Sequence, residues 1–146
     1  MNAAITKPTK TAEIVRNWHL VDVKGKTLGR EATDIAQKLI GKSKPYFAKN
    51  LDCGDFVVVV NAKEVAVTGK KERAKTYTRY SGYPGGLRKV TLEEYRAQRP
   101  EEIIRHAVSG MLPKNKLRAS MLKRLYVFKG AEHKFEDKFT KSEVKE

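Results

Sequence analysis

The residues from Thr78 to Leu87 read TRYSGYPGGL and combine a cation, two aromatic rings and three glycines in one short segment. Glycines and a proline at this density exclude a regular helix or an inner strand, and they leave the backbone open to close approach by a large partner. Arginine and tyrosine supply a planar cation and stacking faces, which suit phosphates, sugars and unpaired bases. Because Tyr-Pro-Gly-Gly is also good turn chemistry, the local pattern alone leaves a plain turn as an equal alternative. A binding loop here would present Arg79, Tyr80, Ser81, Gly82, Tyr83, Pro84, Gly85 and Gly86.

The charge of the chain favours a binding loop over a plain turn. The sequence holds 31 Lys and Arg against 17 Asp and Glu, a formal net charge of +14 with a pI near 9.9, which is typical of a polyanion binder. Seven cations lie between Lys70 and Lys89 against the single acid Glu72, and seven more lie between Ile103 and Ala131 with no carboxylate. Either stretch taken alone is most simply a solvated face, but together they flank the loop. They add these candidate nucleic-acid contacts: Lys70, Lys71, Lys75, Lys114, Asn115, Lys116, Arg118, Lys123 and Arg124.

Length and composition predict one soluble, intracellular domain. A chain of 146 residues buries enough surface for a true core, and its 33% of charged residues makes the surface heavily ionic. The apolar run Phe56–Val60 is too short to cross a bilayer, and the polar start of the chain lacks a secretory signal. The single cysteine, Cys53, makes no internal disulfide and is expected to fill space near the start of a strand. We expect neither a membrane partner nor a homo-oligomer.

The first half of the chain has the pattern of a strand, a helix and a buried strand. A strand is expected to begin at Trp18, after a flexible lead-in over residues 1–16. Apolar residues recur at helical spacing from Leu28 to Ile40, and Gly41 stands where a helix stops. The mostly β-branched run from 56 to 60 is typical of a strand covered on both faces, as in a parallel sheet. This order predicts a βαβ unit.

The second half is predicted to be mostly helical. We expect, in order, an extension of the sheet at 65–67, a short capped helix beginning at 68–75, a helix capped by Thr91 through Arg99, a helix starting at Pro100, a short amphipathic helix marked by Leu117, Met121, Leu122 and Leu125, and a strand at 126–128. The helix after Pro100 has as its expected buried stripe Ile103, Ile104, Ala107, Val108 and Met111. Lys114 and Asn115 fall at the start of the last helix, where they are expected to offer donors to a phosphate. A polar tail over 132–146 leaves a single domain over 17–131.

Nucleotide-binding motifs are incomplete in this chain. Gly25-Lys26-Thr27 lies between an expected strand and helix, as a phosphate-binding loop does, but the motif also needs a glycine where this chain has Leu20. The glycines at 82, 85 and 86 do not reproduce the dinucleotide fingerprint, and they do not follow a predicted strand. We therefore expect no nucleotide cofactor.

Metal binding and catalysis have no positive support in the sequence. The histidines at 19, 106 and 133 lie far apart, without paired cysteines or helical spacing, so a metal site is not expected. His19, beside Trp18, is expected to be structural. Neither Ser81 nor Cys53 has a base at a recognisable spacing, so we expect no enzyme activity.

Several segments together resemble the large-subunit ribosomal protein L-thirteen family in its bacterial form. They are WHLVD at 18–22, KTLGR at 26–30, DCGD at 52–55, NA at 61–62, TGKK at 68–71, SGYPGG at 81–86 and GMLPKN at 110–115. The resemblance covers residues 18–133 in order. It implies a three-layer α/β/α domain on a mainly parallel four-stranded sheet, with basic extended loops and flexible termini. It also implies a structural constituent of the large ribosomal subunit that binds large-subunit ribosomal RNA beside neighbouring ribosomal proteins in the cytoplasm, and that supports early subunit assembly.

The chain departs from the usual form of that family at three places. Tyr80 stands where histidine is common, Arg118-Ala119 where a glycine-led pair is common, and His133-Lys134-Phe135 in place of a histidine-proline-histidine ending. Tyrosine still stacks on a base or reaches a phosphate, so the first change is mild, whereas the last leaves contacts beyond His133 open.

Two alternatives from other classes remain at this stage. A free nucleic-acid-binding protein acting on DNA shares the charge, but it should show a groove-reading helix or a dimer pattern, and none is evident. A small nucleotide-using enzyme shares the βαβ unit, but it lacks the phosphate-binding motif.

Overall fold

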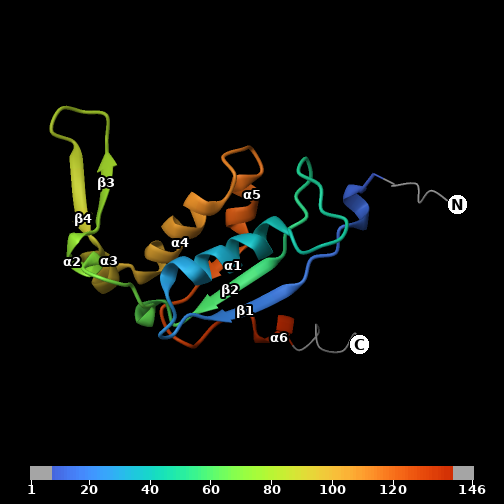
Figure 1. The fold of residues 1–146 in the computed structure, drawn as a ribbon, viewed down its shortest axis with the longest axis horizontal. Coiled ribbons are helices and arrows are strands. Elements are labelled where there is room, and N and C mark those ends of the chain that lie inside the picture. The colour runs from blue at the N-terminus through green and yellow to red at the C-terminus, as the bar shows by residue number, and fades with distance from the viewer. Residues whose placement is uncertain (1–7, 140–146) are drawn as a thin grey trace, which may run out of the picture.

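A three-stranded parallel sheet forms the centre of the computed structural model, which describes residues 8–139 (Figure 1). Its strands are β1 (Trp18–Asp22), β2 (Phe56–Val60) and β5 (Leu125–Val127), in the order β1-β2-β5. Both neighbours pair with β2 in parallel, which explains why the run from Val57 to Val60 is buried. The predicted covered strand is confirmed.

The crossover between β1 and β2 is the helix α1 (Leu28–Ile40). Gly41 ends this helix in the left-handed region, with φ of 79°, and its N–H donates to the carbonyls of Gln37 and Lys38. An added Cβ on Gly41 would lie 2.4 Å from the carbonyl oxygen of Cys53, so the chain also needs glycine here for close packing. The βαβ prediction and the helix stop are confirmed, and Cys53 is buried as expected.

The predicted extension of the sheet at 65–67 is wrong. Asn61 has a φ of 60° and the 3-10 helix η2 (Ala62–Glu64) follows, so the chain turns away from the sheet directly after β2. Ala66 keeps only an isolated parallel bridge to Thr27. Two further strands, β3 (Thr76–Tyr80) and β4 (Leu87–Thr91), form a separate antiparallel hairpin. The fold is therefore mixed α/β with a three-stranded parallel sheet, in place of the expected four-stranded one.

The helices of the second half lie close to their predicted places. They are α2 (Lys71–Ala74), α3 (Leu92–Gln98), α4 (Pro100–Met111) and α5 (Arg118–Lys123). Thr91 and Glu94 form a complete capping box on α3, and Pro100 is the first residue of α4, as predicted. The start of α2 differs, because its first residue is Lys71 and no side chain caps it. Leu125 belongs to β5 and not to the preceding helix.

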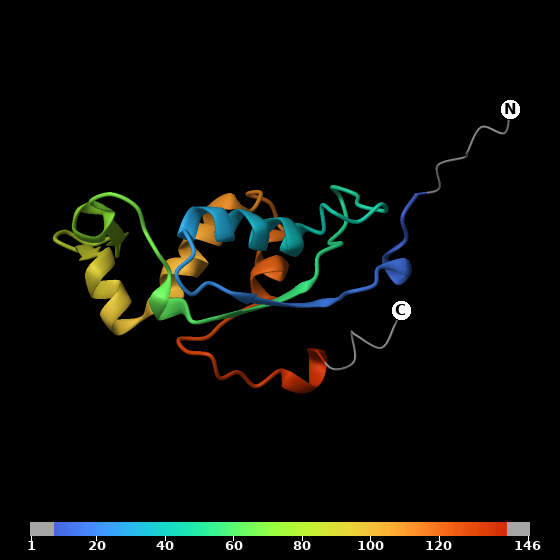
Figure 2. The same ribbon diagram turned by 60° about the horizontal axis from the view of Figure 1, so that its bottom comes forward.

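The main core lies on one face of the sheet, where α1 and α4 pack side by side over the strands (Figure 2). It includes Ile35 and Leu39 of α1 and Ile103, Ile104 and Val108 of α4, all buried. Met111 was expected in this stripe but is 42% exposed. It is the last residue of α4, where its sulfur accepts a hydrogen bond from the Thr33 hydroxyl.

The opposite face of the sheet is covered by the C-terminal segment (Figure 2). The Trp18 ring stacks on Phe56, with centroids 4.4 Å apart, and Phe135 lies 5.2 Å from Trp18. The short helix α6 (Glu136–Phe139) follows and contacts β1. The third layer is thus an aromatic segment with one helical turn. Residues 132–139 of the expected loose tail pack on the domain, and 140–146 lie outside the described residues.

The described part of the lead-in also contacts the domain. It contains the 3-10 helix η1 (Thr11–Glu13). The Thr9 hydroxyl donates to the carbonyl of Tyr46, and the Arg16 guanidinium donates to the carbonyls of Asp52 and Gly54. Within residues 8–139, none of the helices combines the length and apolar character needed to cross a bilayer.

Candidate nucleic-acid interface

The loop that the sequence singles out is the tip of the β3–β4 hairpin, which projects away from the central sheet (Figure 1). Sequence reasoning missed both strands, because neither shows alternating apolar residues and most of their residues are exposed. The usable signal was TYTRY at 76–80, which is rich in β-branched and aromatic residues. The glycines at 82, 85 and 86 therefore do follow a strand, contrary to the prediction. They join two antiparallel strands and precede no helix, so the dinucleotide fingerprint is still absent.

The tip is a closed turn. Gly82 and Gly85 have φ values of 89° and 71°, which few other residues adopt. The N–H of Gly86 donates to the carbonyl of Tyr83 at 3.0 Å, and the N–H of Ser81 donates to the carbonyl of Gly86 at 3.3 Å. An added Cβ on Gly86 would lie 2.0 Å from the Ser81 hydroxyl oxygen. The glycines thus build the turn that presents the neighbouring rings.

Large apolar side chains are exposed at this tip. Tyr83 is 76% exposed, Tyr80 63% and Leu87 53%. Residues 81–86 carry no charge, and Pro84 is exposed among them. Exposed apolar clusters of this kind mark interaction surfaces. The hairpin therefore has an uncharged aromatic tip on a cationic stem.

The two faces of the stem carry different residues. Register pairs Tyr77 with Val90, Arg79 with Arg88, and Tyr80 with Leu87. Because side chains alternate along a strand, Arg79 and Tyr80 point to opposite faces. The sequence analysis grouped these two residues in one loop, whereas in the structure they lie on opposite faces of the hairpin.

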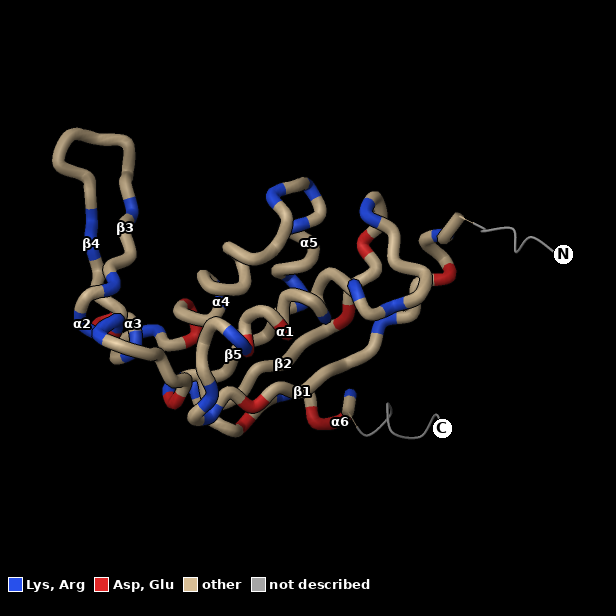
Figure 3. The backbone as a smooth tube through the Cα atoms, viewed as in Figure 1, with Lys and Arg blue, Asp and Glu red and all other residues tan. Residues whose placement is uncertain are grey.

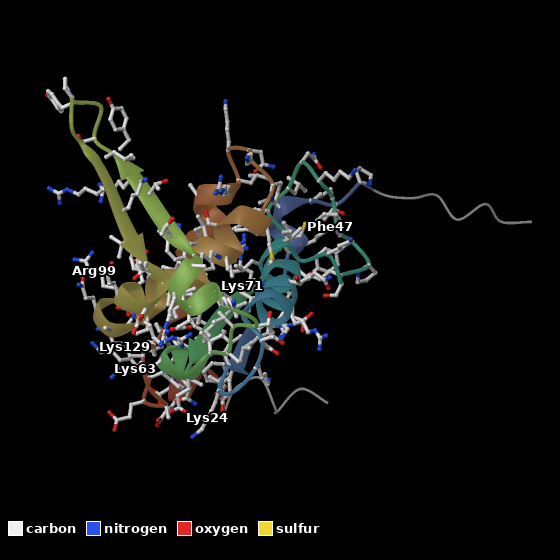
Figure 4. All side chains as sticks on the ribbon, turned by 60° about the vertical axis from the view of Figure 1, so that its left-hand side comes forward. Lys24, Phe47, Lys63, Lys71, Arg99 and Lys129 are labelled. Atoms are coloured by element: carbon white, nitrogen blue, oxygen red, sulfur yellow. The ribbon has the colours of Figure 1, made fainter. Side chains whose placement is uncertain are left out.

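The basic residues of the first stretch lie at the foot of the hairpin. Lys70, Lys71 and Lys75 are exposed on and beside α2, and Lys71 is labelled in Figure 4. The Lys75 ammonium lies 5.2 Å from the centre of the Tyr77 ring. The only acid of this stretch, Glu72, accepts two hydrogen bonds from the Arg96 guanidinium, at 2.6 and 3.0 Å. The positive charge of the three lysines is therefore not offset by Glu72.

The basic turn between α4 and α5 stands on the same side of the molecule as the hairpin (Figures 1 and 3). Lys114, Lys116 and Lys123 are exposed in and after this turn. Asn115 does not start the helix, which begins at Arg118. Its side-chain oxygen instead accepts a hydrogen bond from the N–H of Leu117 at 3.1 Å. Asn115 thus shapes the turn that displays the lysines.

Two arginines predicted as contacts are used inside the protein. Arg124 is only 7% exposed, and its guanidinium binds both carboxylate oxygens of Asp52 and the carbonyl of Leu39. Arg124 is therefore occupied within the fold, and we leave it out of the contacts proposed below. Arg118 is half-buried, and its guanidinium donates to the Ser109 hydroxyl. Charge read from a sequence does not distinguish an exposed cation from a buried, paired one.

A second ionic cluster surrounds Asp55. This buried carboxylate accepts hydrogen bonds from Lys44 and from the N–H of Asn17, and His19 Nε2 lies 2.9 Å from its Oδ2. Burial raises the pKa of Asp55, but the hydrogen bonds from His19, Lys44 and Asn17 outweigh it, so the pKa is lowered from its ordinary value of 3.8. The cluster ties segments together, which gives His19 the structural role expected of it. Among residues 8–139, no three His, Cys, Asp or Glu side chains are grouped as metal ligands.

Comparison with known proteins decides the family. The family model for ribosomal protein L13 matches residues 16–134. The chain belongs to this family. Similar proteins, each named large ribosomal subunit protein uL13, come from Clostridioides difficile (54% identical, covering 91% of both chains), Citrifermentans bemidjiense (51% identical, covering 88% of this chain and 90% of the relative) and Shewanella baltica (52% identical, covering 86% and 89%).

Membership of the ribosomal protein L13 family gives the class of function. Proteins of this family are structural components of the large ribosomal subunit, so the chain is a ribosomal protein of translation and not an enzyme. Ribosomal proteins of this bacterial type work in the cytoplasm. The resemblance seen in the sequence is confirmed.

Proposed function

We propose that this L13-family protein binds large-subunit ribosomal RNA through the β3–β4 hairpin and the two basic segments beside it, and that it supports early assembly of the subunit. One arrangement carries the proposal: an uncharged aromatic tip projects beyond a cluster of exposed lysines at the foot of the hairpin, on the same side of the molecule as the basic turn between α4 and α5. The proposed contact residues are Lys70, Lys71, Lys75, Arg79, Tyr80, Ser81, Gly82, Tyr83, Pro84, Gly85, Gly86, Lys114, Asn115, Lys116, Arg118 and Lys123.

The mechanism is architectural. Lysines from α2 and from the α4–α5 turn neutralise phosphates of separate RNA segments, and each contact releases counterions. The tip is narrow because of its glycines, and it inserts Tyr80 and Tyr83 where unpaired bases offer stacking faces. Selectivity arises from the shape of the folded RNA, because side chains cannot read the deep groove of an RNA helix. Contacts with neighbouring ribosomal proteins complete the placement in the subunit.

Replacing one residue of the stem and one of the tip tests the proposal. We expect Arg79→Ala combined with Tyr83→Ala to lower affinity for large-subunit ribosomal RNA by about tenfold or more, since stacking of one base contributes about 1–3 kcal/mol. The melting temperature should not change, because both side chains are exposed. Filter binding and thermal melting measure the two effects.

Arg30→Ala is the matched control, because Arg30 is an exposed arginine on α1 outside the proposed surface. Unchanged RNA affinity in the double variant, together with unchanged subunit assembly in cells that carry it, would refute the assigned role. Sedimentation of a cell extract at moderate salt adds an independent check, since the protein should travel with the large particle.

Two other function classes predict different results. A free DNA-binding protein would lose ribosomal RNA to an excess of duplex DNA, whereas we expect RNA to be retained. A nucleotide-using protein would be stabilised by free nucleotides in a melting experiment, whereas we expect no shift.

A further inference from the structure

A groove of about 810 Å³ runs between the inner face of the hairpin and the helices α3 and α4. The hairpin contributes Tyr77 and Arg79 from β3 and Arg88 from β4. The helices contribute Tyr95 and Arg99, and Figure 4 shows Arg99 at the foot of the hairpin. The groove is separate from the uncharged tip and from the lysines at 70, 71 and 75.

Three guanidinium groups enter this groove from three different elements. Arg79 and Arg88 are direct cross-strand partners on the same face of the hairpin, and Arg99 lies between α3 and α4. Two like charges directly opposite each other destabilise an antiparallel pair. The free protein therefore carries a repulsion that a bound anion between the strands would relieve.

Carboxylates within residues 8–139 do not supply that anion. Within the described part of the chain, no acid lies within ion-pair distance of Arg79, Arg88 or Arg99. The one acid that lines the groove, Glu102, pairs with Arg105 at 3.5 Å. Other cations of the protein differ in this respect, because Arg124, Lys44 and Arg96 each have a carboxylate partner.

The floor of the groove is aromatic. Tyr77 and Tyr95 meet edge to face with centroids 5.0 Å apart, and the His106 ring lies 5.3 Å from Tyr77. Such packing holds the base of the hairpin against α3 and α4. The guanidinium forks of the stem and of Arg99 match the geometry of phosphate oxygens.

We propose that this groove holds the sugar-phosphate backbone of a ribosomal RNA segment, with Arg79, Arg88 and Arg99 as its phosphate ligands; this rests on the RNA-binding role proposed above. RNA fits better than an acidic protein segment because the hairpin that lines the groove also carries the aromatic tip, which suits bases, and because three arginines in one channel suit a nucleic-acid backbone, which carries a charge on every nucleotide. Arg88 and Arg99 are contacts that the sequence analysis did not select.

Charge removal in the groove tests the proposal without touching the tip. We expect Arg88→Gln and Arg99→Gln each to weaken binding of large-subunit ribosomal RNA by about threefold to tenfold, and to reduce the slope of log affinity against log salt by about 0.7–0.9 per lost phosphate contact. Arg88→Gln should leave the melting temperature of the free protein unchanged or raise it, because it removes a like-charge pair. If Arg88 had a merely structural role, its replacement would lower the melting temperature.

Arg30→Gln serves as the matched control for loss of one exposed positive charge. If the groove variants weaken RNA binding no more than Arg30→Gln, while Tyr83→Ala at the tip still weakens it, the groove proposal is overturned and the proposed function stands. If the wild-type protein does not bind the RNA, the proposed function itself fails. Displacement of bound RNA by polyglutamate of equal charge, at equal concentration, would assign the groove to an acidic protein segment and overturn the proposal.

Discussion

Arg124 illustrates how the same residue type takes opposite roles in this protein. Its guanidinium is enclosed by the carbonyls of Leu39 and Asp55 and by the carboxylate of Asp52, whereas its neighbour Lys123 is exposed. Gly54 is required beside it, because an added Cβ would lie 2.8 Å from the guanidinium and 1.6 Å from the carbonyl oxygen of Leu39. A buried, fully bonded cation contributes to folding, and an exposed one remains free for a partner.

Replacing these two neighbours separates the roles. We expect Arg124→Ala to lower the free energy of unfolding by about 3–5 kcal/mol, because it leaves the Asp52 carboxylate without its buried partner. Lys123→Ala should change stability by less than about 0.5 kcal/mol. Urea unfolding followed by the fluorescence of the single tryptophan, Trp18, measures both. Equal effects in the two variants would contradict this division.

At the scale of elements, two glycines shape the connections between α1 and the strands before and after it. Gly25, before α1, and Gly41, after it, both have positive φ values, of 67° and 79°. The surroundings differ: an added Cβ at Gly25 meets nothing within 4 Å, whereas at Gly41 it would lie 2.4 Å from the backbone oxygen of Cys53. The first glycine serves backbone conformation alone, and the second also allows two chain segments to touch.

This difference gives a matched pair of substitutions. Gly25→Ala should lower the free energy of unfolding by about 1–2 kcal/mol, because it places an L-residue in the left-handed region of backbone conformation. Gly41→Ala should cost that amount and about 1–3 kcal/mol more, because the backbone at Cys53 has to move. Melting temperatures and urea midpoints compare the two, and an equal cost would show that packing against Cys53 adds nothing.

At the scale of the whole molecule, Asp55 joins segments that are distant in sequence. It binds the backbone at Asn17, the His19 ring of β1 and the Lys44 ammonium of the connector after α1. With Arg124, which also reaches the carbonyl of Asp55, the cluster closes one end of the sheet. The protein therefore carries ionic bonds inside the domain that its net charge of +14 does not reveal.

The pH dependence of stability should report on Asp55. Its pKa is lowered in the folded state from 3.8, so its stabilising contribution is fully present above its unfolded pKa and is lost as pH falls through the folded value. We expect the difference in unfolding free energy between wild type and Asp55→Asn to be constant from about pH 7 to pH 5 and to shrink in stronger acid. Urea unfolding across that range measures it. If the difference stays constant into strong acid, the ionised Asp55 carboxylate does not stabilise the fold in the way described.

The sequence alone predicted the parts of this protein that follow from local patterns. The βαβ unit, the helix cap at Thr91, the start of α4 at Pro100 and the family could all be predicted, because the spacing of apolar residues, helix caps and motifs are properties of neighbouring residues. Charge and glycine content also pointed to the segment 78–87 as a candidate site. What could not be read was which polar strands pair, since hairpin pairing of exposed residues leaves little apolar pattern.

Only the tertiary structure shows which cations are buried and which residues distant in sequence come together. The pairing of Arg124 with Asp52, 72 positions apart, and the meeting of Arg79, Arg88 and Arg99 around one groove depend on how β2, β5, the hairpin and α3 are placed in space. No pattern of neighbouring residues encodes such contacts. Whether a cation is buried against a carboxylate or exposed to a phosphate is set by what the rest of the chain brings beside it, and that is a property of the packed domain.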